Sequence, residues 1–119
     1  FLKLQTINNF IDFCLKSNFP KTIITKKKNY IFNDKIKSIN FSTKSKKLNT
    51  KLVKPYYELS NSMYFFSKKF LFSNKTYWNW KNVKFYKVEN NIEFFDIDTE
   101  EEFNIAEMIW PKINSEVFK

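Results

Sequence analysis

The sequence of 119 residues contains no glycine, whereas an average protein contains about 7% glycine. A glycine-rich loop whose backbone N–H groups cradle a nucleotide phosphate therefore cannot be formed by these residues. Arginine and histidine are absent as well, and the chain carries 21 lysines and a net charge of +9. Because the depleted residues have GC-rich codons and the abundant Asn, Ile, Phe and Tyr have AT-rich codons, we attribute part of this charge to codon bias.

The length indicates one domain or part of one, since domains typically contain about 100 to 150 residues. The single cysteine, Cys14, cannot form an internal disulfide, so a reducing compartment is the simpler assumption. No apolar run approaches the roughly 18 residues of a membrane span, and the apolar start at Phe1 to Leu4 is too short for a signal peptide. We therefore expect a cytoplasmic protein without a membrane partner.

Charge is unevenly distributed along the chain. Residues 1–88 contain 19 lysines and three acids, a net charge of +16, whereas residues 89–119 contain two lysines and nine acids, a net charge of −7. Such a chain suits either an anionic substrate held through a metal or a surface that binds nucleic acid. The second interpretation describes a non-catalytic basic module, and its lysine runs are interleaved with Tyr30, Phe32, Tyr77 and Trp78. The absence of arginine, the preferred residue for bidentate phosphate contacts, argues against a nucleic-acid partner.

Hydrophobic periodicity and turn-forming residues divide the first part of the chain into short elements. The expected elements are a helix over 6–16 with Thr6 as N-cap, a buried strand over 22–25, strands over 30–33 and 36–41 joined by a hairpin turn, a helix over 68–73, a loop over 74–82, a strand over 83–88 and a turn over 89–91. In the first helix, Ile7, Phe10, Ile11 and Cys14 share one face. The lysine runs at 26–28 and 44–47 suit either solvated loops or a phosphate-binding patch.

The last part of the chain predicts a strand, an acidic turn and a capped helix. Residues 92–97 are aromatic and β-branched, which favours a strand. Thr99 and Glu102 form a capping box, and three glutamates occupy the first turn, where the helix dipole favours negative charge. Phe103, Ala106 and Trp110 then recur at helical spacing. Pro111 is expected to end the helix, because proline has no N–H to continue it.

Asp96 and Asp98 are the candidate metal ligands. Positions two apart on a strand share a face, so both carboxylates would point the same way, roughly 6 to 7 Å apart. Paired carboxylates suit Mg²⁺ that is bound together with substrate phosphates. The alternative is that both acids are capping or solvated turn residues before a helix.

Residues 95–107, Phe-Asp-Ile-Asp-Thr-Glu-Glu-Glu-Phe-Asn-Ile-Ala-Glu, resemble the closing motif of the acylneuraminate cytidylyltransferases, the CMP-sialic acid synthetase family. That motif is roughly Ile-Asp-Ile-Asp-Thr-Pro-Glu-Asp-Phe-x-x-Ala-Glu. The resemblance implies that Asp96 and Asp98 are catalytic residues that help to hold magnesium. It also implies an α/β fold, namely the C-terminal part of a Rossmann-like nucleotidyltransferase sheet with a β-hairpin dimerisation arm and a C-terminal helix. Residues 1–119 would be a single partial domain, with the arm at about 26–58.

The same resemblance suggests substrate-binding residues. Residues 59–66 are similar to the family's Glu-Asn-Gly-Ser/Ala-Ile/Phe-Tyr loop, so Ser60 falls on its substrate-contacting Asn and Asn61 on its Gly. Asn is a sensible replacement where the backbone needs positive φ. Lys51 falls in the arm, where the family has Arg-x-Gln to read the sugar acid's carboxylate, and it offers a point charge in place of a bidentate fork. Tyr77 and Trp78 lie where an aromatic pair contacts the substrate's acyl group; the alternative is that both are core residues.

The implied reaction joins CTP to a nonulosonic (sialic-type) acid, a nine-carbon 2-keto sugar acid, giving the CMP-sugar and pyrophosphate with Mg²⁺ as cofactor. The resemblance begins in the middle of the family's usual length, and the phosphate loop of the family's N-terminal half is missing. We therefore expect the chain alone to be inactive. Its expected protein partner is a second copy in a homodimer or a complementing N-terminal half.

Overall fold

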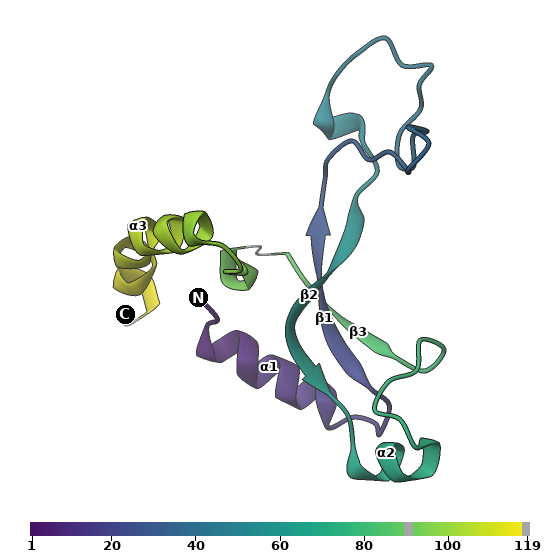
Figure 1. Ribbon diagram of the computed structural model, residues 1–119, viewed down its shortest axis with the longest axis vertical. Helices are drawn as coiled ribbons and strands as arrows, with labels where there is room; N and C mark the ends of the chain where they lie inside the picture. Colours follow the sequence, from purple (N-terminus) through teal and green to yellow (C-terminus); the bar gives the residue numbers. More distant parts are fainter. Residues whose placement is uncertain (90–91, 118–119) are drawn as a thin grey trace.

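Three strands form one mixed sheet in the order β2, β1, β3 (Figure 1). β1 (Lys21–Lys27) pairs antiparallel with β2 (Tyr56–Phe65) and parallel with β3 (Lys84–Val88). The structure is a computed structural model, described for residues 1–89 and 92–117, with side chains as far as residue 113. The predicted strands over 22–25 and 83–88 are confirmed. The predicted turn over 89–91 lies partly outside the described residues.

The helices are α1 (Leu4–Cys14), α2 (Lys68–Asn74) and α3 (Glu100–Val117), with single 3-10 turns at Thr50–Leu52 and Ile92–Phe94. The predicted short helix over 68–73 is confirmed as α2. Its N-cap is Ser67, whose hydroxyl accepts the Phe70 N–H at 3.0 Å. The mixed α/β architecture expected from the sequence is therefore present in a small, three-stranded form.

Helix α1 covers one face of the sheet and forms the core with it. Phe10 and Cys14 of the helix and Ile23 of β1 are buried together, and Phe13 packs beside them. Ile7, Phe10, Ile11 and Cys14 line one cavity, as expected for residues of one helix face, although Ile11 is 47% exposed. Thr6 is not the N-cap. The helix begins earlier, at Leu4, because the backbone N–H of Lys3 donates to the buried carboxylate of Glu93, a tertiary contact that local sequence does not reveal.

Residues 28–55, here called the arm loop, project beyond the end of the sheet between β1 and β2 (Figure 1). The chain is accordingly extended, with dimensions of 52 × 39 × 26 Å and a radius of gyration of 17.8 Å. A compact domain of this length would have a radius of gyration of about 13.5 Å. The arm loop lies within the range of about 26–58 expected for an arm, and the first and last residues of that range belong to β1 and β2.

Asn40 holds the base of the arm loop together. Its side-chain amide donates to the carbonyls of Asn29 and Lys54, both at 2.8 Å, and its amide oxygen accepts the Ile31 N–H at 3.0 Å. Asn40 is 8% exposed, so these bonds are largely shielded from water. The two predicted strands over 30–33 and 36–41 are not formed as such. The hairpin turn is present, but it is closed by one isolated bridge, Phe32 to Ser38.

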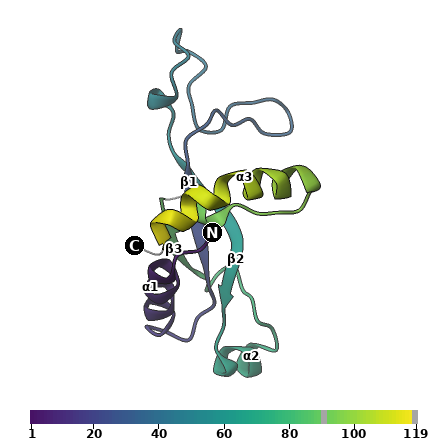
Figure 2. The ribbon, with the colours of Figure 1, turned by 90° about the vertical axis from the view of Figure 1, so that its left-hand side faces the viewer.

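Helix α3 contains Pro111, so the prediction that this proline ends the helix is wrong. A proline inside a helix removes one backbone hydrogen bond. Trp110, Pro111 and Lys112 are exposed, so water can reach this turn and solvate the carbonyl that loses its partner. Figure 2 shows α1 and α3 on the same side of the sheet.

The other face of the sheet carries Ile24 of β1, Tyr57 and Leu59 of β2, and Phe85 of β3, with Trp80 from the loop before β3 beside them. These five side chains line a hollow of about 290 Å³. Within the described residues, neither α1 nor α3 covers this face (Figures 1 and 2). No helix in the described part of the chain is long and apolar enough to cross a membrane.

Candidate functional site

The candidate site starts from an irregularity in β2. Leu59 pairs with Ile24 and Tyr64 pairs with Thr22, so the four residues 60–63 lie opposite the single residue Ile23. Such a bulge bends a strand and redirects its side chains. The hydroxyl of Thr22 fixes the bulge by donating to the Met63 carbonyl at 3.0 Å.

Asn61 occupies the tip of this bulge with φ of +54°. Asn61 therefore has the left-handed backbone conformation in which asparagine is a sensible replacement for glycine. Its side-chain oxygen accepts the Tyr64 hydroxyl at 2.8 Å, and the Ser60 and Ser62 hydroxyls are hydrogen-bonded at 2.7 Å. The bulge thus presents three short polar side chains, with those of Asn61 and Ser62 exposed.

An aromatic pocket lies next to the bulge. The Tyr64 ring lies 5.8 Å from Trp78, Phe66 lies 5.6 Å from Tyr77, and Trp78 lies 5.3 Å from Trp80, measured between ring centroids. With Leu59 these side chains line a pocket of about 560 Å³. Tyr77 is 57% exposed and Trp78 half-buried, so the alternative that both are ordinary core residues is wrong.

Tyr64, Phe66 and Trp80 were not predicted as site residues. The sequence did contain a signal for Tyr64 and Phe66, because these two aromatic residues are two positions apart and such positions share one face of a strand. Trp80 gave no comparable signal, since its position is set by the loop between α2 and β3. Tyr64 connects the two halves of the site, because its hydroxyl bonds Asn61 and its ring packs on Trp78.

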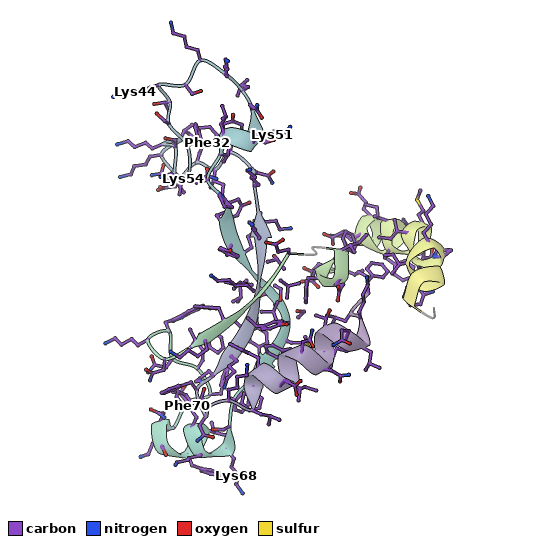
Figure 3. The ribbon with its side chains drawn as sticks, turned by 180° about the vertical axis from the view of Figure 1, so that it is seen from behind. Phe32, Lys44, Lys51, Lys54, Lys68 and Phe70 are labelled. Atoms are coloured by element: carbon purple, nitrogen blue, oxygen red, sulfur yellow. The ribbon has the colours of Figure 1, made fainter. Side chains whose placement is uncertain are left out.

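Lys51 lies far from this pocket. It belongs to the 3-10 turn Thr50–Leu52 in the arm loop, where its backbone N–H donates to the Asn49 side chain at 2.9 Å. In Figure 3, Lys51 lies with Phe32, Lys44 and Lys54 at one end of the molecule, whereas Lys68 of α2 lies at the other end. Within one chain, Lys51 cannot act together with Tyr77 and Trp78.

The predicted strand over 92–97 is not formed. Ile92–Phe94 is a 3-10 turn, and residues 95–98 have no regular structure. The buried Glu93 is held against the Lys3 N–H at 3.2 Å, and the Phe95 ring lies 6.2 Å from Phe1. These contacts direct the segment toward the start of α1 and away from strand pairing. The argument that the Asp96 and Asp98 carboxylates point the same way because they alternate along a strand is therefore wrong.

The Asp96 and Asp98 side chains are exposed on this irregular segment. One carboxylate oxygen of Asp96 accepts the Ile97 N–H at 3.1 Å. Within the described residues, the Asp98 carboxylate has neither a hydrogen bond nor an ion pair, while the Asp98 backbone N–H donates to Glu102 at 2.9 Å. Both aspartates can therefore offer carboxylate oxygens to a ligand.

The capping box after these aspartates is confirmed. The Thr99 hydroxyl accepts the Glu102 N–H at 3.2 Å, and the Glu102 carboxylate accepts the Thr99 N–H at 2.8 Å and the Thr99 hydroxyl at 2.9 Å. Hydrogen bonds from the Thr99 hydroxyl and from the backbone N–H groups of Asp98 and Thr99 lower the pKa of Glu102. The box fixes where α3 starts and so where the Asp98 backbone lies.

Asp96 and Asp98 by themselves supply too few ligands to hold a magnesium ion. No group of three or more Asp, Glu, His or Cys residues that could hold a metal occurs in the described part of the chain. Mg²⁺ needs near-octahedral oxygen ligands and is commonly held by one or two carboxylates together with water and substrate phosphates. Asp96 and Asp98 fit that role only when phosphates complete the shell.

Comparison with protein-family models, with curated proteins and with solved structures found no match. The chain itself brings Asn61, Tyr77 and Trp78 to one region through Tyr64. Lys51 and the segment of Asp96 and Asp98 lie in two other regions of the molecule (Figures 1 and 3).

Proposed function

We propose that this chain is the C-terminal part of an enzyme like the acylneuraminate cytidylyltransferases, which couple CTP to a sialic-type 2-keto sugar acid. The observation that carries the proposal is the left-handed backbone of Asn61, at the position where the resemblance has glycine. The capping box of Thr99 and Glu102, directly after the two motif aspartates, supports it. The fold assigned to the intact enzyme is a Rossmann-like nucleotidyltransferase sheet. Both β2 and β3 are edge strands here, so that sheet can continue beyond either one.

In the proposed reaction, the anomeric hydroxyl of the sugar acid attacks the α-phosphorus of CTP. A new O–P bond forms, the bond to the β-phosphate oxygen breaks, and pyrophosphate leaves while the hydroxyl proton passes to solvent or to a base. The pocket with Tyr77 and Trp78 takes the apolar acyl group, and Ser60 and Asn61 contact the polar part of the sugar. Magnesium held by Asp96 and Asp98 supplies charge neutralisation at the phosphates.

The separation of the site regions gives the proposal a specific form. Because Lys51 and the segment of Asp96 and Asp98 each lie in a region apart from the aromatic pocket, the proposal requires that one catalytic site be assembled from residues of two copies of the chain. The nucleotide phosphates are bound by a glycine-rich loop from a complementing N-terminal half. The assembly is thus a homodimer in which the arm of each copy reaches the other, so that the same contact is made twice, as in an isologous pair.

The decisive experiment is reconstitution. The chain is co-expressed with an N-terminal half of a family member that carries the phosphate loop, and CMP-sugar formation is measured. We expect no activity for the chain alone, activity for the pair, and loss of activity with Asp96→Asn or Asp98→Asn, which keep the side-chain shape but remove the charge.

Asp12→Asn is the matched control, because Asp12 is an exposed acid on α1, away from the motif. It should leave the reconstituted activity unchanged. If activity is undiminished when both motif aspartates are changed to Asn, they have no catalytic role and are only turn residues before a helix.

A further inference from the structure

The arm loop, residues 28–55, concentrates positive charge. Its 28 residues include eight lysines and one aspartate, a net charge of +7. The ion pairs of the described chain, Lys26 with Glu89 and Lys27 with Glu58, use lysines outside this loop. Within the described residues, the arm lysines are therefore not neutralised by any carboxylate of the chain.

Aromatic rings line a pocket among these lysines. Phe41 lies edge-to-face with Tyr30 at 4.8 Å and with Phe32 at 5.1 Å, measured between ring centroids. The three rings are part of the lining of a pocket of about 540 Å³, to which Lys46 and Lys47 also belong. Phe32 is 49% exposed, so its ring is accessible to a ligand.

The pocket is held open by the fold of the loop. The backbone N–H of Asn49 donates to the Tyr30 hydroxyl at 2.8 Å, which ties the far side of the loop to the ring. Asn40 fastens the base through its bonds to Asn29, Ile31 and Lys54. In Figure 3, Lys44 lies at the outer end of the arm loop and points away from the body.

We propose that the arm loop binds single-stranded nucleic acid, with a base stacked on the rings of Tyr30, Phe32 and Phe41 and the phosphodiester backbone on Lys44, Lys46 and Lys47. Proteins that bind single strands without sequence preference combine a positively charged groove along the backbone with aromatic side chains on which bases stack. Positive charge and aromatic rings both occur here within one short segment. A membrane surface fits less well, because the described arm loop contains no amphipathic helix, only the three-residue turn Thr50–Leu52. This binding uses Lys44, Lys46 and Lys47 and not the Lys51 of the proposed enzyme, and a second copy docked on the arm loop would compete with it.

The first test measures binding of a fluorescent oligonucleotide of about 12 nucleotides, within the 4 to 16 nucleotides typical of such sites. Oligothymidine and oligouridine distinguish DNA from RNA, and a duplex of equal length tests the preference for single strands. The whole chain is titrated at several salt concentrations. Stronger binding of a single strand than of the duplex is expected, and equal or stronger binding of the duplex would overturn the proposal.

The second test separates charge from stacking. Changing Lys44, Lys46 and Lys47 together to Gln should lower affinity about tenfold or more and reduce the slope of log K against log salt by about 2, since each contact to a single strand contributes about 0.7. Phe32→Leu should lower affinity about fivefold or more without changing the salt slope, because stacking involves no counterion release. A Phe32→Leu variant that binds normally would overturn the stacking role and with it the proposal.

Matched controls lie at the other end of the molecule. Lys68, Lys69 and Lys81 are exposed lysines in and after α2, and their combined change to Gln removes the same charge. Phe72→Leu alters an α2 ring that is 69% exposed. Both controls should retain affinity within about twofold, and circular dichroism should show that every variant is folded. If the control change of Lys68, Lys69 and Lys81 weakens binding as much as the arm-loop lysine change does, the arm loop is not the binding site.

The third test names the competitors. Inorganic polyphosphate tests pure charge, vesicles with phosphatidylserine test a membrane, and a peptide of residues 93–107 of this chain tests an acidic protein surface. The oligonucleotide should bind more tightly than each of these. Equal or tighter binding of any competitor would replace nucleic acid by that partner.

Discussion

Tyr64 donates a 2.8 Å hydrogen bond to the side chain of Asn61, three residues earlier in the same strand, while its ring packs 5.8 Å from Trp78. This arrangement exists because the bulge in β2 places residues 60–63 opposite one residue of β1. The bulge thereby couples a left-handed backbone position to an aromatic pocket. A substitution at Asn61 should therefore alter both the conformation of the bulge and the packing of the aromatic pocket.

Asn61→Ala should lower the free energy of unfolding by about 1 to 2 kcal/mol, because alanine pays the steric cost of positive φ and lacks the hydrogen bond to Tyr64. Asn61→Gly separates these causes, since glycine accepts positive φ freely but also lacks the side chain. Chemical denaturation should rank the stabilities as Gly above Ala. Equal stability of the two variants would show that the backbone conformation at residue 61 contributes nothing.

Cys14 should react slowly with thiol reagents while the chain is folded. It is 2% exposed, and burial raises its pKa, an effect that the positive charge of Lys21 only partly opposes. Less thiolate forms at a given pH, and the reagent has no access. Alkylation at about pH 8 should be at least about tenfold slower in buffer than in denaturant.

A double variant provides the control for this measurement. Cys14→Ser with Ser73→Cys moves the thiol to an exposed position in α2. That thiol should react at the rate of a free cysteine, whose ordinary pKa is about 8.5. Fast alkylation of the native Cys14 would mean that α1 is not docked on β1.

Local sequence information sufficed where local chemistry decides the structure. The strand around Ile23, the Ser67-capped helix α2 and the capping box of Thr99 follow from residue type and spacing alone. At Asn61 the resemblance pointed to a position where positive φ would suit the residue, because the family has glycine there and asparagine tolerates that conformation.

Predictions failed where a distant residue decides the structure. Residues 92–97 are rich in strand-forming side chains, but the bond from the Lys3 N–H to buried Glu93 holds part of them in a 3-10 turn. The contact joins residues 90 positions apart, so no local pattern contains it. The aromatic pocket was predicted only in part for the same reason, since its rings come from β2 and from the loop before β3.

The start of α3 should depend on pH through Glu102. Its pKa is lowered by hydrogen bonds from the Thr99 hydroxyl and the backbone N–H groups of Asp98 and Thr99. A lowered pKa in the folded state means that the stabilisation is complete above the ordinary glutamate pKa of about 4.3 and is lost as pH falls through the lowered value. Amide NMR signals of residues 98–103 should therefore shift during acid titration of the native chain.

Two variants isolate this effect from the other acids of the first turn. Glu102→Gln should remove the acid-induced shift at residues 98 and 99, because the side chain no longer titrates. Thr99→Ala should cost about 1 kcal/mol of helix stability through loss of the cap. It should also move the Glu102 pKa toward its ordinary value. An unchanged titration in both variants would contradict the capping box as its source.

Self-association through the arm loop should weaken as salt rises. The loop carries a charge of +7, and two such loops repel each other, so a second copy is expected to present its acidic residues 93–107 to the loop. Sedimentation at tens of micromolar chain should show dimers at low salt and more monomer at about 0.5 M salt, where charges are screened within a few Å. Glu100→Gln with Glu101→Gln should shift the equilibrium toward monomer, whereas Asp12→Asn should not, because Asp12 lies on α1 outside the acidic segment.

The alternative contact is apolar, through exposed arm residues such as Ile36 and Leu48, which are 76% and 92% exposed. Dimers that persist or strengthen at high salt would support that apolar contact and contradict the electrostatic one, because burial of apolar surface is not weakened by screening.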